Sequence, residues 1–415
     1  MNSTCGPSDV MDQNGAQSPA MIRAQTLSGP MQEWRRRFHR RPELSFAEYQ
    51  TAEDIARVLE SIPGMRVSQR IGGTTGVCAR VGQTGGQRIA LRADMDALPI
   101  TEPYRVEFAS EVPGVMHACG HDAHMAILLG AAHLIAEDML RGNIDGEVVF
   151  IFQPAEETPD ITGKTGAPHL IDAGVLDGVD AVLALHMDPQ TPVGQARLHD
   201  GVCMANTDNF RARILGAGGH AGYPNLALDP LWLLVPVLEA IHGIRSRRLS
   251  PLEAAAVSVC RIQGGTTNNV IPPYVDLEGT LRSYGDEARE LIVQELQRAL
   301  SVADILGGHG ELHIDRCEPA VVNNPALNRV IQDAVCTATR HTPLWNGPFG
   351  MGGEDFGFMS RLVPSALFFL GCAPPGIPGT SLHSPDFVLD ERVLPVGAAI
   401  FLEAVRKFLR EGLAV

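Results

Sequence analysis

The sequence predicts an α/β protein in which a second, ferredoxin-like domain interrupts the first. Two observations lead to this fold class. Strand-like apolar segments alternate with helical ones, and the segment from Thr207 to Ile314 has the order strand, helix, strand, strand, helix, strand. That order is the split motif of ferredoxin-like domains. The length of 415 residues agrees with two domains, because a single hydrophobic core stops growing at about 250–300 residues.

The composition is that of a globular protein, with 45% hydrophobic and 20% charged residues. No apolar run reaches the roughly 20 residues that cross a bilayer, so the sequence predicts a soluble protein without a membrane partner. The formal net charge is −15, and the Lys and Arg residues are scattered, which argues against a nucleic-acid partner. We therefore expect a small-molecule substrate.

The eight cysteines lie far apart and form no CxxC pair. This pattern is typical of reduced, intracellular thiols rather than of a disulfide framework. The first 20 residues are rich in Ser, Gly, Asn, Gln and Asp and lack the basic start and apolar core of a secretory signal. We therefore predict a disordered tail over residues 1–20 and a cytoplasmic location.

Helical patterning opens the first domain. It covers Met31–Arg40 and Ala47–Leu59, which are separated by a break at Pro42. A longer helix, rich in Ala, Leu, Ile and Met, is predicted over His121–Asp138, between two predicted strands. Its length suits the crossover helix of a parallel βαβ unit.

Three predicted strands lead directly into ionisable residues. They are Arg88–Leu91, followed by Asp94 and Asp96; Glu147–Phe152, followed by Glu156 and Glu157; and Ala181–Leu185, followed by His186. In an open α/β sheet, ligands bind just beyond the carboxyl ends of the strands. Four carboxylates and an imidazole at one edge of the sheet predict an active site there.

The inserted domain is predicted over 206–315, and the first domain over 21–205 and 316–415. The elements of the insert are, in order, the strand Asn209–Leu215, the helix Pro230–Ile244, the strands Ala255–Gln263 and Val275–Ser283, the helix Glu287–Leu306 and the strand Glu311–Ile314. Pro236 lies inside the first of these helices, where we expect a kink because proline removes a backbone donor. The first domain then resumes with the helix Ala326–Thr339, the strand Ala366–Leu370 and the helix Val396–Leu409.

The densest group of chemically active residues runs from His117 to His124, where a loop enters the helix that begins at His121. One glycine separates Cys119 from His121, so a thiolate and an imidazole can face one ion while the glycine allows a tight backbone path. The alternative is a helix N-terminus with Asp122 as a first-turn acid and solvated histidines. Three histidines, a cysteine and an aspartate within eight residues favour a metal site.

The pair Glu156 and Glu157 follows an apolar strand and the dipeptide Gln153-Pro154. Adjacent acids are common in solvated turns, so the pair alone would carry little weight. At the end of a buried strand, however, one carboxylate can bind metal while its neighbour holds the attacking water and moves its proton.

His186 and His383 complete the candidate ligands, although each alone is equally compatible with an ordinary polar role. Two ions that share bridging ligands could be held by five residues, namely Cys119, His121, Glu157, His186 and His383. Asp94 and Asp96 are candidates to orient the ligand imidazoles from behind. Thiolate and imidazole suit Zn²⁺, Co²⁺ or Ni²⁺, and carboxylates admit Mn²⁺.

Five longer strings occur in order along the chain. They are Arg-Arg-Pro-Glu-Leu-Ser-Phe from Arg40, Leu-Arg-Ala-Asp-Met-Asp-Ala-Leu-Pro-Ile from Leu91, Met-His-Ala-Cys-Gly-His-Asp-Ala-His from Met116, Phe-Gln-Pro-Ala-Glu-Glu from Phe152 and Leu-His-Ser-Pro-Asp-Phe from Leu382. Together they resemble the auxin-conjugate and hippurate hydrolase branch of the aminoacylase and carboxypeptidase metallopeptidase superfamily. The resemblance covers nearly everything after the tail.

The resemblance implies a metallopeptidase-type catalytic domain with an inserted dimerisation domain and a binuclear metal site. It implies metal-dependent hydrolysis of the amide bond of N-acyl amino acids or amino-acid conjugates, which releases a carboxylic acid and a free amino acid. A dipeptidase or carboxypeptidase on the same scaffold is the alternative. A silent binding protein is a further rival, but it would lack the base or the ligands, and all are present here.

Residue by residue, the resemblance implies that Glu156 is the general base and that the five candidate ligands bind metal. The wider superfamily carries His-x-Asp where this chain has Asp94-Met-Asp96. That difference makes Cys119 a replacement ligand and leaves the role of Asp94 open.

The insert carries a second constellation, which includes His220, Asn269 and Arg282. These residues could be turn residues and a solvated strand arginine. His and Arg can also hold a polarised carbonyl and a free carboxylate, the arginine bidentately. The resemblance implies substrate binding by all three, dimerisation through the insert, and a His220 that reaches a neighbouring active site.

Two segments depart from the usual strings of the family. One follows Glu157 and runs from Thr158 to His169, and the other is Cys203–Thr207. Both are expected near the cleft, so the choice of substrate can differ from that of the relatives.

Overall fold

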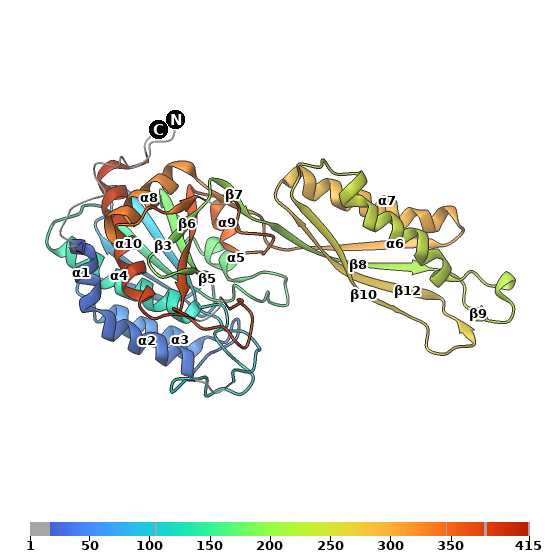
Figure 1. Cartoon of the computed structure of the whole chain (residues 1–415), viewed down its shortest axis with the longest axis horizontal. Coiled ribbons are helices and arrows are strands. Elements are labelled where there is room, and N and C mark those ends of the chain that lie inside the picture. The colour runs from blue at the N-terminus through green and yellow to red at the C-terminus, as the bar shows by residue number, and fades with distance from the viewer. Residues whose placement is uncertain (1–16, 104–105, 346, 377–379, 414–415) are drawn as a thin grey trace. The chain divides into compact units, whose positions relative to one another are not determined.

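The computed structural model describes residues 17–103, 106–345, 347–376 and 380–413 (Figure 1). In the described ranges the chain divides into two compact units. Unit 1 comprises Met1–Gly201, Val322–Gly347 and Phe358–Val415, and unit 2 comprises Val202–Val321 and Pro348–Gly357. Unit 2 is therefore inserted into unit 1 along the sequence.

The predicted disordered tail lies mostly outside the described residues, but its last residues contradict the prediction. Ser18 caps the helix α1 (Pro19–Thr26), because its hydroxyl accepts the amide of Met21 at 3.1 Å. Pro19 occupies the first helical position, where a missing amide hydrogen costs nothing. The dipeptide Ser18-Pro19, a typical start of a helix, is the sequence signal for α1.

A mixed sheet forms the centre of unit 1, with the order β1-β2-β4-β3-β5-β16-β6-β15. The strands are β1 (Arg66–Ile71), β2 (Gly76–Gly82), β3 (Arg88–Asp94), β4 (Glu147–Gln153), β5 (Ala181–Pro192), β6 (Ala196–Leu198), β15 (Leu344–Trp345) and β16 (Ser365–Ala373). Strand β3 is parallel to both β4 and β5, and β16 is parallel to β5. The carboxyl ends of these strands therefore meet at one edge of the sheet.

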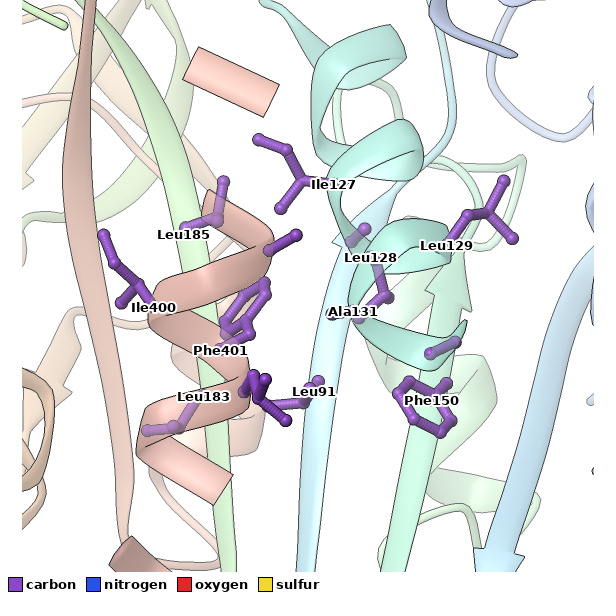
Figure 2. Close-up of a cluster of buried hydrophobic side chains, with 14 of the residues drawn as sticks. Leu91, Ile127, Leu128, Leu129, Ala131, Phe150, Leu183, Leu185, Ile400 and Phe401 are labelled. Atoms are coloured by element: carbon purple, nitrogen blue, oxygen red, sulfur yellow. The ribbon is translucent and has the colours of Figure 1, made fainter. Parts of the chain in front are cut away.

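Helices flank this sheet. They are α1, α2 (Ser28–Arg40), α3 (Tyr49–Glu60), α4 (His121–Leu140), α5 (Gly166–Asp172), α8 (Pro325–Thr339), α9 (Phe356–Ser360) and α10 (Val393–Glu411). Helix α4 links β3 to β4, which confirms the predicted βαβ unit. Side chains of α4 and α10 gather with Leu91, Phe150 and Leu183 of the central strands (Figure 2).

Helix α4 is also the one helix in the described ranges that is long and apolar enough to cross a bilayer. Within the structure 78% of that apolar window is buried. Its side chains are buried on all faces because it lies among α2, α10 and the sheet, so its apolar character is that of a core helix.

Unit 2 has the predicted ferredoxin-like order. Its sheet runs β10-β12-β8-β13, with β8 (Asn206–Leu215), β10 (Ala255–Gly264), β12 (Tyr274–Ser283) and β13 (His309–Arg316). Helices α6 (Pro230–Arg247) and α7 (Asp286–Ile305) cover one face of this sheet (Figure 1). Their apolar side chains share a second hydrophobic core with it. Helix α6 runs continuously through Pro236. The short elements are β7 (Gly201–Met204), β9 (Gly219–His220), η1 (Pro224–Leu226), β11 (Val270–Ile271) and β14 (Val321–Asn323).

Candidate metal centre

Residues from four separate segments of unit 1 come together at one place. Three groups of ligand atoms, each within 4.8 Å of one another, share members: Cys119, His121 and His186; Cys119, Glu157 and His383; and His121, Glu156 and Glu157. The structure thus brings together all five predicted ligands and the predicted base. The shared members make the three groups one continuous cluster.

Gly120 allows the two ligands beside it to face the same point. Its φ of +90° lies in the left-handed region, which favours glycine. A Cβ at Gly120 would also lie 2.8 Å from Cγ of Met187. The predicted role of this glycine is confirmed, and Cys119 Sγ lies 3.4 Å from His186 Nε2 across the same loop.

His186 lies within a strand rather than at its end, so the predicted end of this strand is wrong. Strand β5 continues to Pro192 because β16 still pairs with it, whereas β3 pairs only as far as Ala184. Nδ1 of His186 donates to the carbonyl of Met187 at 2.9 Å. Burial lowers the pKa of His186 to about 4, so the ring is neutral and Nε2 carries the lone pair that a metal needs.

His121 and Glu157 present unpaired polar atoms to the centre of the cluster. Nδ1 of His121 donates to the carbonyl of Asp96 at 2.9 Å, which turns Nε2 inward. Within the described residues neither His121 Nε2 nor Glu157 Oε1 forms a hydrogen bond, although both atoms are buried. Buried atoms of this kind cost free energy unless something binds them, so they fit a metal ion.

Carboxylates make the surroundings of His121 strongly negative. Burial opposes a charge on His121, but the carboxylates of Asp94, Asp96 and Glu157 raise the pKa of His121 to about 10. The same carboxylates favour a divalent cation, which would leave the imidazole neutral and free to coordinate. The donor set therefore fits the group that the sequence predicts.

His383 reaches the cluster on a strained backbone. Its φ of +57° is left-handed, which costs a non-glycine residue on the order of 1 kcal/mol. Its amide donates to the carbonyl of Ala118 at 2.9 Å, beside Cys119, and its Nε2 lies 3.2 Å from Glu157 Oε1. Strain of this kind is common at functional sites, where the surrounding structure enforces it.

Asp94 and His124 could form another ligand group with His121, because their donor atoms also lie within 4.8 Å. Both nitrogens of His124 are already engaged. Nδ1 donates to Asp94 at 2.6 Å, and Nε2 accepts the amide of Met187 at 2.9 Å. His124 therefore fixes the backbone beside His186 and has no nitrogen left for a metal.

The hydrogen bonds of Asp94 go to residues other than the predicted ligands, although its carboxylate lies 3.7 Å from Nε2 of the predicted ligand His121, so its orienting role stays a prediction. Asp94 binds His124, which is not a predicted ligand, and accepts Arg92 at 2.7 Å. Asp96 matches the prediction more closely. Its carbonyl holds His121, and its Oδ2 accepts the amide of Glu157 at 3.0 Å.

A buried ionic network lies behind the first turn of α4, and its pairing was not predicted from the sequence. The carboxylate of Asp122 accepts hydrogen bonds from Arg35 at 3.0 Å and from His39 at 2.8 Å. The other ring nitrogen of His39 lies 3.1 Å from Glu102. Burial disfavours the charge on Asp122, but Arg35 and His39 hold its pKa well below the usual range. The network fixes the start of the helix that carries His121. The basic run in α2 was its only sequence signal.

His117 stands apart from the ligand groups, although the sequence places it in the same cluster. It is buried, and within the described ranges neither ring nitrogen forms a hydrogen bond. Burial lowers its pKa to about 4. Of the three histidines in the 117–124 string, His121 is thus the one in the cluster of predicted ligands.

The three predicted substrate-binding residues lie in unit 2, where two come together and the third does not. His220 on β9 pairs with Val270 on β11, and the carbonyl of Asn269 accepts the amide of Ala221 at 3.2 Å. Arg282 lies near the opposite end of β12, opposite Thr207 of β8. Tyr274, which pairs with the end of β8, is eight steps along the strand from Arg282, a separation of about 26 Å.

The segment after Glu157, which departs from the family strings, is organised around Asp160. One carboxylate oxygen accepts the amides of Thr162 at 2.7 Å and Lys164 at 3.2 Å. The other oxygen contacts His169 Nε2 at 2.9 Å. The departure is therefore an ordered turn.

Comparison with protein families gives a match to the model "Peptidase family M20/M25/M40" over residues 90–407. The chain is 38% identical over 374 residues to N-acetylcysteine deacetylase of Bacillus subtilis, covering 89% of this chain and 94% of that protein. It is 36% identical over 377 residues to thermostable carboxypeptidase 2 of Saccharolobus solfataricus, with coverage of 88% and 91%. It is 35% identical over 394 residues to IAA-amino acid hydrolase ILR1-like 4 of Arabidopsis thaliana, with coverage of 91% and 85%.

Among solved structures, the chain is similar to the YXEP protein of Bacillus subtilis, described as a dinuclear metal binding peptidase from the M20 family. The TM-score is 0.82 with 33% identity, and the match covers 93% of this chain and 99% of that chain. Both the catalytic fold and the insert are included in this coverage. The chain therefore belongs to peptidase family M20/M25/M40, a family of metal-dependent hydrolases.

Proposed function

We propose that the protein hydrolyses the amide bond of N-acyl amino acids or amino-acid conjugates and releases a carboxylic acid and a free amino acid. One observation carries this proposal. A carboxylate oxygen of Glu156 lies within 4.8 Å of ligand atoms of His121 and Glu157. A base beside a dinuclear ligand cluster is what metal-assisted amide hydrolysis requires.

Two divalent cations, when bound, polarise the scissile carbonyl and lower the pKa of a shared water. The residues that would hold them are Cys119, His121, Glu157, His186 and His383. The mixed thiolate, imidazole and carboxylate set admits Zn²⁺, Co²⁺, Ni²⁺ or Mn²⁺.

Glu156 acts as general base in this proposal. It takes a proton from the attacking water and returns it to the leaving amine. Its side chain is half-buried, so water and substrate can reach it, whereas the neighbouring ligands Cys119 and His121 are buried. Asp96 positions the site through its hydrogen bonds with His121 and with the amide of Glu157. Asp94 does so through its hydrogen bond with His124.

We assign the recognition of substrate to unit 2 and infer that it works as a homodimer. Arg282 binds the free carboxylate, and His220 and Asn269 hold the tetrahedral oxyanion. The two ends of β12 lie about 26 Å apart, farther than the length of an acyl amino acid, which supports a substrate site completed by two copies. A second copy can supply His220.

The surface of unit 2 supports such a dimer. Strand β10 is an edge strand, and an exposed edge invites pairing with another chain. On α6, Leu231, Trp232 and Val235 expose 42%, 54% and 64% of their surface. Exposed apolar residues beside an open edge favour a protein interface. We also propose a cytoplasmic location for this dimer, which the widely spaced cysteines support.

A carboxypeptidase or dipeptidase activity is the second candidate, and the similarity to a carboxypeptidase favours it. Both activities need the same metals and base, so only the substrate separates them. Turnover of acyl amino acids, such as N-acetylcysteine and hippurate, should be compared with that of dipeptides and acyl dipeptides. A clear preference for peptides would replace the first proposal by the second.

Metal dependence is tested on protein purified without chelator, with its metal content measured. Exhaustive chelation should abolish amide hydrolysis, and Mn²⁺, Co²⁺ or Zn²⁺ should restore it. Full activity at a verified absence of metal would overturn the proposal.

A further inference from the structure

The segment Glu43–Glu48 contributes no predicted ligand, yet Glu48 contacts the turn that carries Glu156 and Glu157, and Ser45 reaches this turn through Asp96. Ser45 donates to Asp96 Oδ2 at 2.6 Å, and the same oxygen accepts the amide of Glu157 at 3.0 Å. Glu48 Oε1 accepts the amide of Ala155 at 2.8 Å. The turn is therefore held on both sides of Glu156.

Ala155 needs this support because its backbone is strained. Its φ is +50°, in the left-handed region, where a residue with a Cβ loses on the order of 1–2 kcal/mol. The residue is fully buried, and its carbonyl accepts the amide of Gly166 at 2.8 Å. The direction in which Glu156 leaves the strand β4 depends on this conformation, since Ala155 is its immediate neighbour.

Glu48 has no other evident purpose at this position. It precedes α3, but its side chain does not cap that helix. Glu43 does so instead, accepting the amides of Gln50 at 3.1 Å and Thr51 at 2.8 Å. The carboxylate of Glu48 is fully buried, where its second oxygen accepts the hydroxyl of Thr75 at 2.6 Å. Burying a carboxylate is costly, so a buried carboxylate that binds a strained amide calls for a functional reason.

We propose that Glu48 is a positioning residue for the general base, because its carboxylate holds the strained Ala155 turn that directs Glu156 at the metal cluster. The inference rests on the proposed role of Glu156. Glu48 reaches the turn through the amide of Ala155 and also holds the hydroxyl of Thr75, while the parallel contact from Ser45 through Asp96 acts on Glu157. Loss of Glu48 should therefore damage proton transfer more than metal binding.

The test compares Glu48→Ala with Glu48→Gln in the metal-loaded protein. Glu48→Ala removes the acceptor and should lower kcat about 10- to 100-fold, the range expected when a supporting contact of a reactive group is lost. KM and metal content should stay near those of the wild type. Glu48→Gln keeps an amide oxygen for Ala155 and should retain most of kcat.

Two further measurements separate positioning from general damage. Ala155→Gly, introduced into Glu48→Ala, should restore part of kcat because glycine adopts the left-handed conformation without strain. Hydrogen exchange of the 153–158 peptide, measured without substrate, should increase in Glu48→Ala and stay slow in Glu48→Gln. Glu43→Ala is the matched control, since it should lower the melting temperature through α3 and leave kcat unchanged.

The outcomes distinguish this inference from the proposed function. Wild-type kcat and slow exchange in Glu48→Ala would overturn the inference, as would an equal loss of kcat in Glu48→Gln. If Glu48→Ala does not fold, Thr75→Val loosens the same carboxylate and should lower kcat a few-fold, and wild-type kcat there would overturn it. Full activity of Glu156→Gln, in contrast, would show that Glu156 is not the general base. The hydrogen-exchange rates would still test whether Glu48 holds the Ala155 turn.

Discussion

The candidate residues of the two units differ in how firmly the surrounding structure holds them. In unit 1, His121, His186 and Glu157 are each oriented by a hydrogen bond to a backbone or side-chain partner. In unit 2, His220 and Asn269 are exposed, and the hydrogen bonds given for their side chains reach only two residues along the chain, to Gly222 and Thr267. We therefore expect the chemistry to be prearranged within one chain, whereas substrate recognition in the proposed dimer would depend on a more adaptable surface of unit 2.

The largest effect is expected for the site in unit 1. Substitutions of Glu156 and Glu157 should impair activity for different reasons. Glu156→Gln keeps size and shape but removes the base, so kcat should fall by roughly 10²–10⁴-fold with metal still bound. Glu157→Ala removes a ligand, so metal occupancy should fall, and excess metal should recover part of the activity.

The metal content and kcat of both variants, measured with and without added metal, distinguish loss of the base from loss of a ligand. Excess metal should not rescue Glu156→Gln. Loss of metal in Glu156→Gln together with normal occupancy in Glu157→Ala would reverse the two roles.

A smaller effect is expected for Arg282 in unit 2. Arg282→Ala should raise KM about 10- to 100-fold for substrates with a free carboxylate and far less for their amides, because it removes a charge-assisted pair. The control is Arg211→Ala, whose side chain is exposed on a neighbouring strand and pairs with Asp315. Equal effects on acids and amides would remove Arg282 from this role.

Mixed dimers sharpen the comparison between the units. If His220 acts on a neighbouring copy, then mixing inactive His220→Ala with inactive Glu156→Gln should regenerate activity, since one of the two sites then holds both intact residues. Each variant alone gives the baseline. No recovery in mixtures that are shown to exchange subunits would confine His220 to its own chain.

The smallest effect concerns stability alone and uses the other end of α4. Asp138 accepts Arg23 at 2.7 Å and Arg406 at 2.6 Å, and it thereby ties α4 to α1 and α10. Asp138→Asn should cost about 1–3 kcal/mol of unfolding free energy at pH 7 and leave kcat unchanged.

The pH dependence of this effect has a definite sign. Burial opposes the charge on Asp138, but the hydrogen bonds from Arg406 and Arg23 hold its pKa below the ordinary value. A lowered pKa in the folded state contributes stability that is present above the unfolded value near pH 4 and is lost as the pH falls through the folded value. Thermal melts of both proteins should therefore converge in acid. Asp304→Asn, at an exposed aspartate of unit 2, is the control for the substitution itself.

Much of the fold was predictable because its elements follow strong periodic patterns. The β-α-β-β-α-β order of unit 2 and the crossover helix α4 are examples. The ligand cluster was predictable because strand ends converge in parallel sheets. What the sequence did not reveal depends on side chains that meet across long separations, such as Asp122 with Arg35 and Glu48 with Ala155. Local patterns do not encode such pairs.

The place of β16 in the sheet has a consequence for how the protein is made. Strand β16 lies between β5 and β6, yet its residues follow unit 2 in the sequence. On the ribosome, the strands of unit 2, all within 206–316, emerge complete while the catalytic sheet still lacks a central strand. Until β16 is synthesised, the edge of β5 that will pair with it stays uncovered. His383 is synthesised after β16. We therefore expect the proposed ligand set to be complete only late in synthesis, after an interval in which the open edge of the sheet favours aggregation.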